Sequence, residues 1–235
     1  RCGVDVAAAA VRRGWNGYWA EYIVRRDSDI YTFGDLAGKT WAYPDAGSTS
    51  GFIVPSVELQ AAGIEVGDQI EAGGHNQVVQ AVYSGEADFG TTFFSPAAVP
   101  GAPWAVGDNP EPYDLTVDES RVTADGLFVG DVQVLDARAN IRETAPDVVQ
   151  QVRILRLSAP IPNDTLSFGA AFPAELRASI LAALYAFAET EAWSQSIGSE
   201  DFYGWSGLAP IDDATYDVVR LQFQLLGLTE QDIFG

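Results

Sequence analysis

Strand-like and helix-like segments alternate along residues 18–94, and this alternation limits the possible folds more than any other feature of the chain. Residues 18–26 and 40–43 are rich in aromatic and β-branched residues and predict strands. Apolar residues at helical spacing predict helices over residues 52–62 and 75–84. Strands that alternate with helices are typical of α/β proteins with parallel strand pairs, so we predict an α/β fold.

The second half of the chain has a different pattern of predicted elements. Residues 96–130 contain five of the 12 prolines and many acidic residues, and we predict an insertion or long surface loop without regular secondary structure. Beyond it, the patterns predict a strand over residues 152–157 and helices at three places, which are residues 136–151, 174–190 and 214–226. The helix at 174–190 has the strongest apolar periodicity of all.

Charge and composition exclude several classes of protein. The chain has 235 residues, and 33 Asp and Glu oppose 13 Lys and Arg, which gives a formal net charge of -20. A negative field of this size repels nucleic acid. No apolar run approaches the length of a membrane span, about 18 residues. We therefore expect a soluble body with no nucleic-acid partner.

The rare residues limit the chemistry further. Cys2 is the only cysteine and His75 the only histidine, so the sequence predicts no internal disulfide, no metal site and no cofactor. The chain contains no methionine, and we expect Arg1 to follow a segment that was processed or is missing.

One polar motif stands where the second predicted strand meets the next helix. Gly47 is followed by three hydroxyl residues, Ser48, Thr49 and Ser50, and then by Gly51. The first N–H groups of a helix lack intrahelical partners and, with the helix dipole, favour an anion. The two glycines would let the backbone approach such a ligand. The alternative is ordinary N-capping, for which one Ser or Thr suffices.

His75 stands in a Gly-Gly-His-Asn loop that begins the next predicted helix. A lone histidine in such a loop is more often a residue that bonds its neighbours than a catalyst. A serine hydrolase built on Ser48 or Ser50 with His75 is a third possibility, although the Gly-x-Ser-x-Gly elbow of such enzymes is missing around the serines. We therefore expect a protein that is not an enzyme.

Several stretches, taken in order, resemble the phosphonate-type substrate-binding proteins of ABC importers. These stretches cover most of residues 12–95 and 136–228. They are Tyr22–Ser28, Asp35–Thr40, Ser48–Gly51, Gly74-His75, Gly85–Asp88, Pro160–Asp164 and Phe202–Pro210. The resemblance implies a type II periplasmic-binding-protein-like α/β fold, with mixed sheets, helices on both sheet faces and two lobes joined by two crossover hinge strands.

The resemblance also implies a division of the chain. Residues 1–25 would hold a remnant of lobe one and the first crossover strand, and residues 26–157 would form lobe two with the insertion at 96–130. Residues 158–235 would hold the second crossover and C-terminal helices returning to lobe one. The family begins with a strand-helix-strand-helix unit of lobe one that has no counterpart here, so we expect a fragment or a reduced fold.

The function implied by the resemblance is capture of a small phosphorus oxyanion for an ABC permease in the membrane. The ligand-binding residues carried over from matching positions are Ser48, Thr49, Ser50, Gly51, His75, Asp164 and Tyr18. Relatives that bind aminophosphonates have an acidic residue near the end of the loop after Thr91, and Thr92–Ser95 contains none. Phosphite, phosphate or a simple phosphonate is thus as good a candidate as an amine-bearing ligand.

The implied location is periplasmic or extracellular, with a membrane anchor in the missing N-terminal segment as a further possibility. An alternative function is a scaffold or surface interaction protein that reuses the binding-protein fold and contacts other surface proteins through residues 96–130.

Overall fold

The computed structural model describes residues 3–199, 204–225 and 227. The chain divides into two compact units, and the second unit contains the residues that matter most for the site. One unit comprises residues 1–18 and 160–221, and the other comprises residues 19–159 and 222–235. The chain passes between the units within strand β2 (Gly17–Arg25) and again between β9 (Val152–Leu157) and β10 (Ile161–Pro162).

An antiparallel sheet of order β11-β1-β12 forms the centre of the first unit. Four consecutive alanines of β1, Ala7–Ala10, are buried in it. The elements of this unit are β1 (Val4–Val11), β11 (Thr165–Gly169), α4 (Ala174–Ala188), α5 (Glu191–Ser194), β12 (Gly207–Pro210), the 3₁₀ turn η4 (Asp213–Tyr216) and α6 (Asp217–Leu225), which runs on into residues of the second unit.

Helix α4 confirms the predicted helix, but its apolar residues are not buried. Among the described residues none of α4 is buried, and Leu176 is 50% exposed. The apolar periodicity of this segment therefore predicted a helix correctly but did not identify buried core residues.

The second unit is built on a mixed sheet. Its strand order is β2-β5-β3-β4, and β9 pairs with β2, while β10 of the first unit pairs with the start of β2 at Gly17 and Tyr18. Strand β3 runs parallel to β4 and β5, as the alternating pattern predicted, and β2 runs antiparallel to β5 and β9. The further elements are the 3₁₀ turn η1 (Phe33–Leu36), β3 (Trp41–Tyr43), the π-helical turn η2 (Thr49–Ile53), α1 (Val54–Ala61), β4 (Gln69–Glu71), α2 (His75–Ser84) and β5 (Phe89–Phe94).

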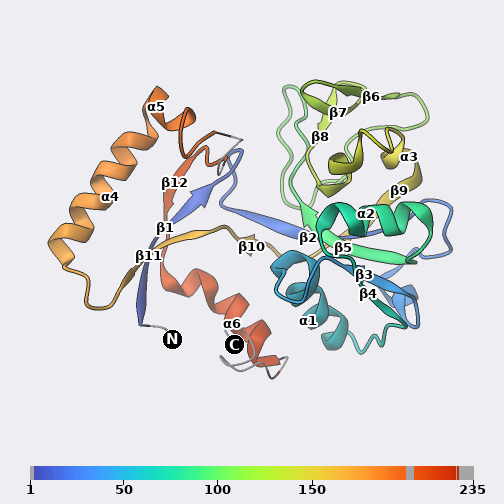
Figure 1. Ribbon diagram of the computed structural model, residues 1–235, viewed down its shortest axis with the longest axis horizontal. Helices are drawn as coiled ribbons and strands as arrows, with labels where there is room; N and C mark the ends of the chain where they lie inside the picture. The colour runs from blue at the N-terminus through green and yellow to red at the C-terminus, as the bar shows by residue number, and fades with distance from the viewer. Residues whose placement is uncertain (1–2, 200–203, 226, 228–235) are drawn as a thin grey trace. The chain divides into compact units, whose positions relative to one another are not determined.

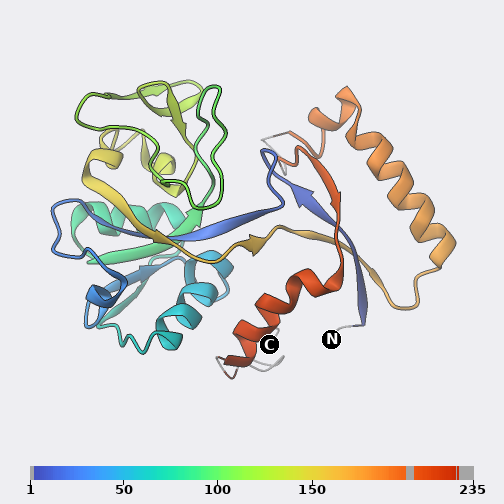
Figure 2. The same ribbon diagram turned by 180° about the vertical axis from the view of Figure 1, so that it is seen from behind.

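Helices α1 and α2 cover opposite faces of this sheet (Figures 1 and 2). Successive side chains of a strand point to opposite faces, and β2 and β5 each show a contact with one of the two helices. The Tyr22 hydroxyl donates to Glu58 of α1 at 2.9 Å. On the other face α2 packs closely on β5, because a Cβ added at Gly90 would lie 2.6 Å from Val78 Cγ1. The sheet is thereby held between two helical layers.

The segment at 96–130 is more ordered than the sequence predicted. It contains β6 (Ser120–Thr123) and β7 (Gly126–Val129), which form an antiparallel sheet with β8 (Val132–Val134). Trp104, Leu127 and Val129 are buried. The prediction of a loop without secondary structure was therefore wrong for this part, because prolines and acidic residues mark the connections and hide the short strands between them.

A single helix over residues 136–151 was also predicted wrongly. The structure has the 3₁₀ turn η3 (Ala137–Ile141) and the short helix α3 (Val148–Gln151). Asp136 caps η3 by accepting from the Arg138 N–H at 3.0 Å. Pro146 disfavours helical geometry at the residue before it and cannot donate a backbone hydrogen bond. The apolar periodicity therefore continues across a break in the helix.

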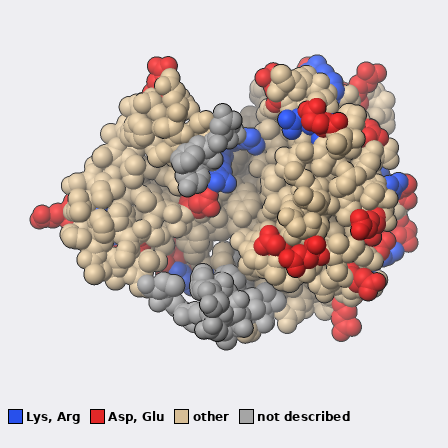
Figure 3. Space-filling view, viewed as in Figure 1, with Lys and Arg blue, Asp and Glu red and all other residues tan. Residues whose placement is uncertain are grey.

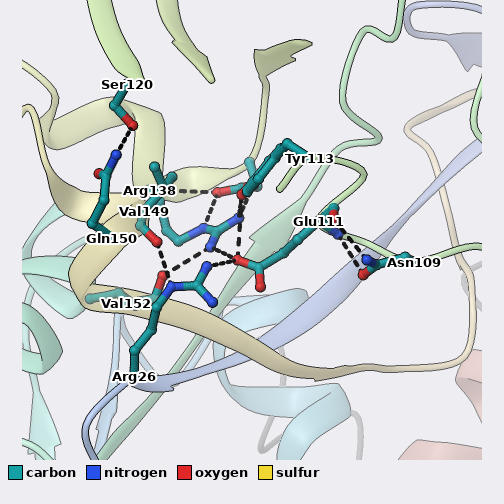
Figure 4. A network of polar contacts seen from close by, with 10 residues as sticks. Arg26, Asn109, Glu111, Tyr113, Ser120, Arg138, Val149, Gln150 and Val152 are labelled. Carbon is teal, nitrogen blue, oxygen red and sulfur yellow. Dashed lines mark hydrogen bonds and ion pairs between the residues drawn. The ribbon is translucent and has the colours of Figure 1, made fainter. Parts of the chain in front are cut away.

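A buried ionic cluster ties the 96–130 segment to the sheet (Figure 4). The Arg138 guanidinium is fully buried and donates to Asp136 at 2.9 Å, to the Tyr113 hydroxyl at 3.0 Å and to Glu111. Arg26, which directly follows β2, donates to the same Glu111 carboxylate at 2.6 Å. Glu111 thus joins the inserted segment to Arg26 after β2 and to Arg138 of η3.

Candidate oxyanion site

The carboxyl ends of β3, β4 and β5 meet at one edge of the mixed sheet. β3 leads into the turn η2 and helix α1, and β4 leads into α2, so two helix starts lie at this edge. The loop before α2 is held against the end of β3, since the Gly73 N–H donates to the Pro44 carbonyl at 2.8 Å. In α/β sheets, ligands bind at this edge.

Ser48 is the N-cap of the first helix start. Its Oγ accepts from the Gly51 N–H at 3.1 Å, and its carbonyl accepts from Phe52 and Ile53 at 2.9 and 3.0 Å. The double acceptance widens the first turn into the π-helical η2, a form common at functional sites. Ser48 therefore has the capping role that the sequence left as the alternative, and its hydroxyl hydrogen stays available for donation.

The next two hydroxyls have no such role. Among the described residues, Thr49 Oγ1 and Ser50 Oγ form no hydrogen bond, although Ser50 is only 3% exposed. Their backbone N–H groups belong to the first turn, which lacks intrahelical acceptors. Two hydroxyls and a helix start thus offer donors that the described part of the chain does not use.

Packing in the turn also requires a glycine at position 51. A Cβ at this position would overlap the Pro44 ring and lie 2.8 Å from Ser48 Oγ. The absence of a side chain lets the turn pack on Pro44. Packing thus accounts for a glycine at this position, and its approach to a ligand stays a prediction.

Two threonines of β5 connect the parts of the site, and the sequence analysis missed them. Thr91 and Thr92 are both fully buried. On one sheet face Thr91 Oγ1 accepts from Trp41 Nε1 at 2.7 Å and donates to the Gly51 carbonyl. Thr92 Oγ1 contacts His75 Nδ1 at 2.6 Å. Adjacent polar residues in an otherwise apolar strand, Phe-Gly-Thr-Thr-Phe-Phe, were the available signal.

His75 is the first residue of α2 and is half-buried beside β5. Its ring meets the edge of the Phe93 ring at 5.1 Å between centroids. Burial lowers the pKa of His75 below its ordinary value, and the nearby Asp45 carboxylate opposes this by favouring the charged form. The histidine is therefore neutral at physiological pH and offers a neutral ring nitrogen.

Tyr18 and Asp164, the other predicted ligand-binding residues, belong to the first unit. The Asp164 carboxylate forms an ion pair with Arg12 at 2.6 Å, and the side chains are 59% and 46% exposed. Tyr18 pairs with Ile161 of β10 in the backbone ladder. Their contact with a ligand stays a prediction.

The described segments at this sheet edge, residues 44–51, 72–78 and 91–95, contain no Lys or Arg. Within the part of the chain that the structure describes, no group of three metal-ligating side chains occurs. Acidic side chains are spread over the surface in several small groups on the face seen in Figure 3. The donors at the sheet edge act at contact distance, whereas surface charges are screened over about 8 Å at physiological ionic strength. A small anion can therefore bind here in spite of the net charge.

Comparisons with known proteins agree with an anion-binding role. The family described as "ABC transporter, phosphonate, periplasmic substrate-binding protein" matches residues 1–216. No curated protein matches the chain. No helix among the described residues has the length and apolar character to cross a membrane.

Three solved structures have a similar fold. A Xanthomonas citri protein bound to ATP is 17% identical with a TM-score of 0.66, over 95% of this chain and 71% of that one. PhnD1 from Prochlorococcus marinus, in complex with methylphosphonate, is 12% identical with a TM-score of 0.58, over 96% and 72%. A binding protein component of an ABC phosphonate transporter from Pseudomonas aeruginosa is 16% identical with a TM-score of 0.53, over 94% and 61%.

Proposed function

Because this chain belongs to the family of periplasmic substrate-binding proteins of phosphonate ABC transporters, we propose that it binds its ligand through the turn at Ser48–Gly51 and through His75. The chain is a solute-binding protein for a small phosphorus oxyanion, and an ABC permease is the partner that this role implies. The assignment of individual residues is our proposal.

One observation carries this assignment. The hydroxyls of Thr49 and Ser50 stand at a helix start without a hydrogen-bond partner in the described structure, at the same sheet edge as His75. Polar groups that are largely buried normally have partners. A tetrahedral oxyanion would accept hydrogen bonds from these hydroxyls and from the first N–H groups of the turn.

We further propose that the ligand carries no amine. Residues 92–95, where relatives that bind aminophosphonates have an acidic residue, contain no carboxylate. Methylphosphonate, phosphite and phosphate all present acceptor oxygens and no ammonium group. Methylphosphonate, the ligand in the Prochlorococcus marinus structure, is the first probe to use.

The test replaces Thr49 by Val and Ser50 by Ala, alone and together. A hydrogen bond to a charged group contributes about 1.5–3 kcal/mol, so the double variant should bind methylphosphonate at least about tenfold more weakly in titration calorimetry. Its free energy of unfolding in urea should stay close to that of the unchanged protein, because these hydroxyls have no partner among the described residues. Phosphite and inorganic phosphate are titrated in parallel.

The matched control is Thr123→Val with Ser179→Ala, which alters two exposed residues outside the site. This control should bind as the unchanged protein does. Equal affinity in the site variant and the control would reject the residue assignment. If the unchanged protein produced no heat with any of the three anions, the choice of ligand would be wrong.

The finer parts of the role are also proposals. We propose that Tyr18 and Asp164 contact the ligand as well, and Asp164→Asn tests this by its effect on the affinity for methylphosphonate. Attachment to the membrane through an N-terminal segment, and contacts of residues 96–130 with other surface proteins, follow from the sequence analysis alone.

The hydrolase alternative lacks geometric support. In the described structure His75 bonds Thr92 and has no hydrogen bond to Ser48 or Ser50. An activated serine needs its base within hydrogen-bond reach. We therefore do not propose an ester hydrolase.

A further inference from the structure

The hydrogen bond between His75 and Thr92 decides which ring nitrogen of His75 faces a ligand as a donor. Nδ1 of His75 and Oγ1 of Thr92 are 2.6 Å apart. A neutral imidazole carries its proton on one nitrogen only, while a hydroxyl can donate or accept. The direction of this one bond therefore fixes the tautomer.

The neighbouring Thr91 shows how the partners of a hydroxyl set the direction of its hydrogen bonds. Thr91 Oγ1 accepts from the indole N–H of Trp41, which can only donate, and donates to the Gly51 carbonyl, which can only accept. Its hydroxyl is fully satisfied. Thr92 is equally buried, yet in the described part of the chain its hydroxyl has only His75 as a hydrogen-bond partner.

Glu21 lies opposite Thr92 in the β2–β5 pair, but it is not a second hydrogen-bond partner for the Thr92 hydroxyl. Both Glu21 carboxyl oxygens are buried and have no hydrogen-bond partner among the described residues, so they do not accept the Thr92 hydrogen. If Nδ1–H donated to Thr92, the threonine O–H would be left in the interior without an acceptor. An unsatisfied buried donor costs about 1–3 kcal/mol.

We infer that Thr92 donates its hydroxyl hydrogen to Nδ1 and so holds His75 as the Nε2–H tautomer, with Nε2–H as a donor for an acceptor oxygen of the ligand. Among the described residues Nε2 makes no hydrogen bond, and it is not among the fully buried atoms without partners. Thr92 is thus a positioning residue that acts through His75. The role of Nε2–H toward a ligand rests on the proposed function. The tautomer of His75 rests only on the geometry of the ligand-free protein.

The tautomer can be read in the protein without any ligand. Because His75 is the only histidine, a long-range ¹H–¹⁵N spectrum of uniformly labelled protein shows one imidazole ring. We expect a protonated, pyrrole-type Nε2 and an unprotonated Nδ1 whose resonance is shifted by an accepted hydrogen bond. A pyrrole-type Nδ1 in the unchanged protein would overturn the inference at once, whatever the protein binds.

Thr92→Val removes the hydroxyl and keeps the shape of the side chain. We expect Nδ1 to move to the position of an unbonded nitrogen while Nε2 stays protonated, and Thr92→Ser to restore the shift. If Nδ1–H had been the donor, Thr92→Val would instead exchange the types of the two nitrogens. Should Thr92→Val fail to fold, the spectra of the unchanged protein and of Thr92→Ser still decide the direction.

Binding supplies a separate readout. Methylphosphonate should shift the Nε2 resonance, and Thr92→Val should weaken its binding by roughly threefold to tenfold, as expected for losing the orientation given by one hydrogen bond. Thr92→Ser should restore the affinity, and Thr123→Val is the control. Absence of methylphosphonate binding in the unchanged protein would count against the proposed function and leave the tautomer result in force. An unshifted Nε2 in a protein that does bind would contradict the donor role.

Discussion

Glu21 is the residue whose environment departs furthest from what its side chain favours. It lies in β2 with no exposed surface, and neither carboxyl oxygen has a hydrogen-bond partner among the described residues. Burial raises its pKa well above the ordinary value of 4.5, and the carboxylates of Asp136 and Glu111 raise it further, while Arg138 opposes them. The folded chain therefore keeps a proton on Glu21 up to a higher pH than the unfolded chain does.

This difference predicts a pH dependence of stability. Because the folded pKa lies above the unfolded one, the stability that the proton contributes is complete below about pH 4.5 and is lost as the pH rises through the folded pKa. Glu21→Gln should remove this decline, which amounts to at most about 1.4 kcal/mol per pH unit. Urea unfolding of both proteins at several pH values from about 5 to about 8 measures it. If the free energy of unfolding changed with pH in the same way in both proteins, Glu21 would ionise equally in the folded and unfolded states.

For single residues, the sequence predicted which residue types form the candidate site better than it predicted their hydrogen-bond partners. Ser48 and His75 could be selected because hydroxyls at a helix start and a histidine in a glycine loop are visible locally. The contacts of Gly51 and His75 with β5 could not be predicted, since these residues lie 40 and 17 positions from Thr91 and Thr92. Ser48 differs from Ser50 through a local contact, because its hydroxyl caps the turn at the Gly51 N–H three residues on, whereas the Ser50 hydroxyl is unused in the described structure.

Among the elements, those with a strong local pattern were predicted well. β2, β3, α2, β9 and α4 lie within a few residues of their predicted bounds. The helix predicted at 52–62 begins as a π-helical turn at Thr49, because the Ser48 carbonyl accepts two N–H groups. The strands β6 and β7 were missed, since strands of four residues are too short to show a period and are stabilised by pairing.

The buried cluster around Arg138 predicts how the 96–130 segment is held. Arg138→Met should lower the free energy of unfolding by about 3–5 kcal/mol, because Asp136 and Glu111 would keep buried charges without their main partner. We also expect faster proteolytic cleavage within residues 96–130, which limited proteolysis with mass spectrometry detects.

Arg121→Met is the matched control for this change. Arg121 forms an exposed ion pair with Asp131 at 3.8 Å, and exposed pairs contribute about 1 kcal/mol or less. Similar losses of stability in the two variants would show that the Arg138 cluster is no stronger than a surface pair. In that case other contacts hold the segment.

For the whole molecule, the predicted α/β fold of the type II periplasmic binding proteins is confirmed, as are the family and the role in binding a small phosphorus oxyanion. The order of the motifs made this possible, because short stretches such as Asp35–Lys39 are uninformative alone. The sequence could not show how the mixed sheet brings two helix starts and β5 to one edge, since that depends on strand order.

The net charge of -20 predicts how salt affects capture of an anion. Long-range repulsion slows the encounter, whereas the donors at the site act at contact distance. The association rate for methylphosphonate, followed by tryptophan fluorescence in stopped flow, should rise several-fold from about 10 mM to about 150 mM potassium gluconate, as the screening length falls from about 30 to about 8 Å. A rate that falls with added salt would indicate a positive field at the site.

The two threonines of β5 also limit how such a protein can change over time. Thr91 holds the Ser48–Gly51 turn and Thr92 holds His75, and adjacent strand residues face opposite sides. Gaining or losing one residue ahead of Thr91 would turn each threonine toward the wrong helix and uncouple both halves together. Ligand preference can therefore drift through substitutions in the two loops, while the length of β5 stays under strict selection.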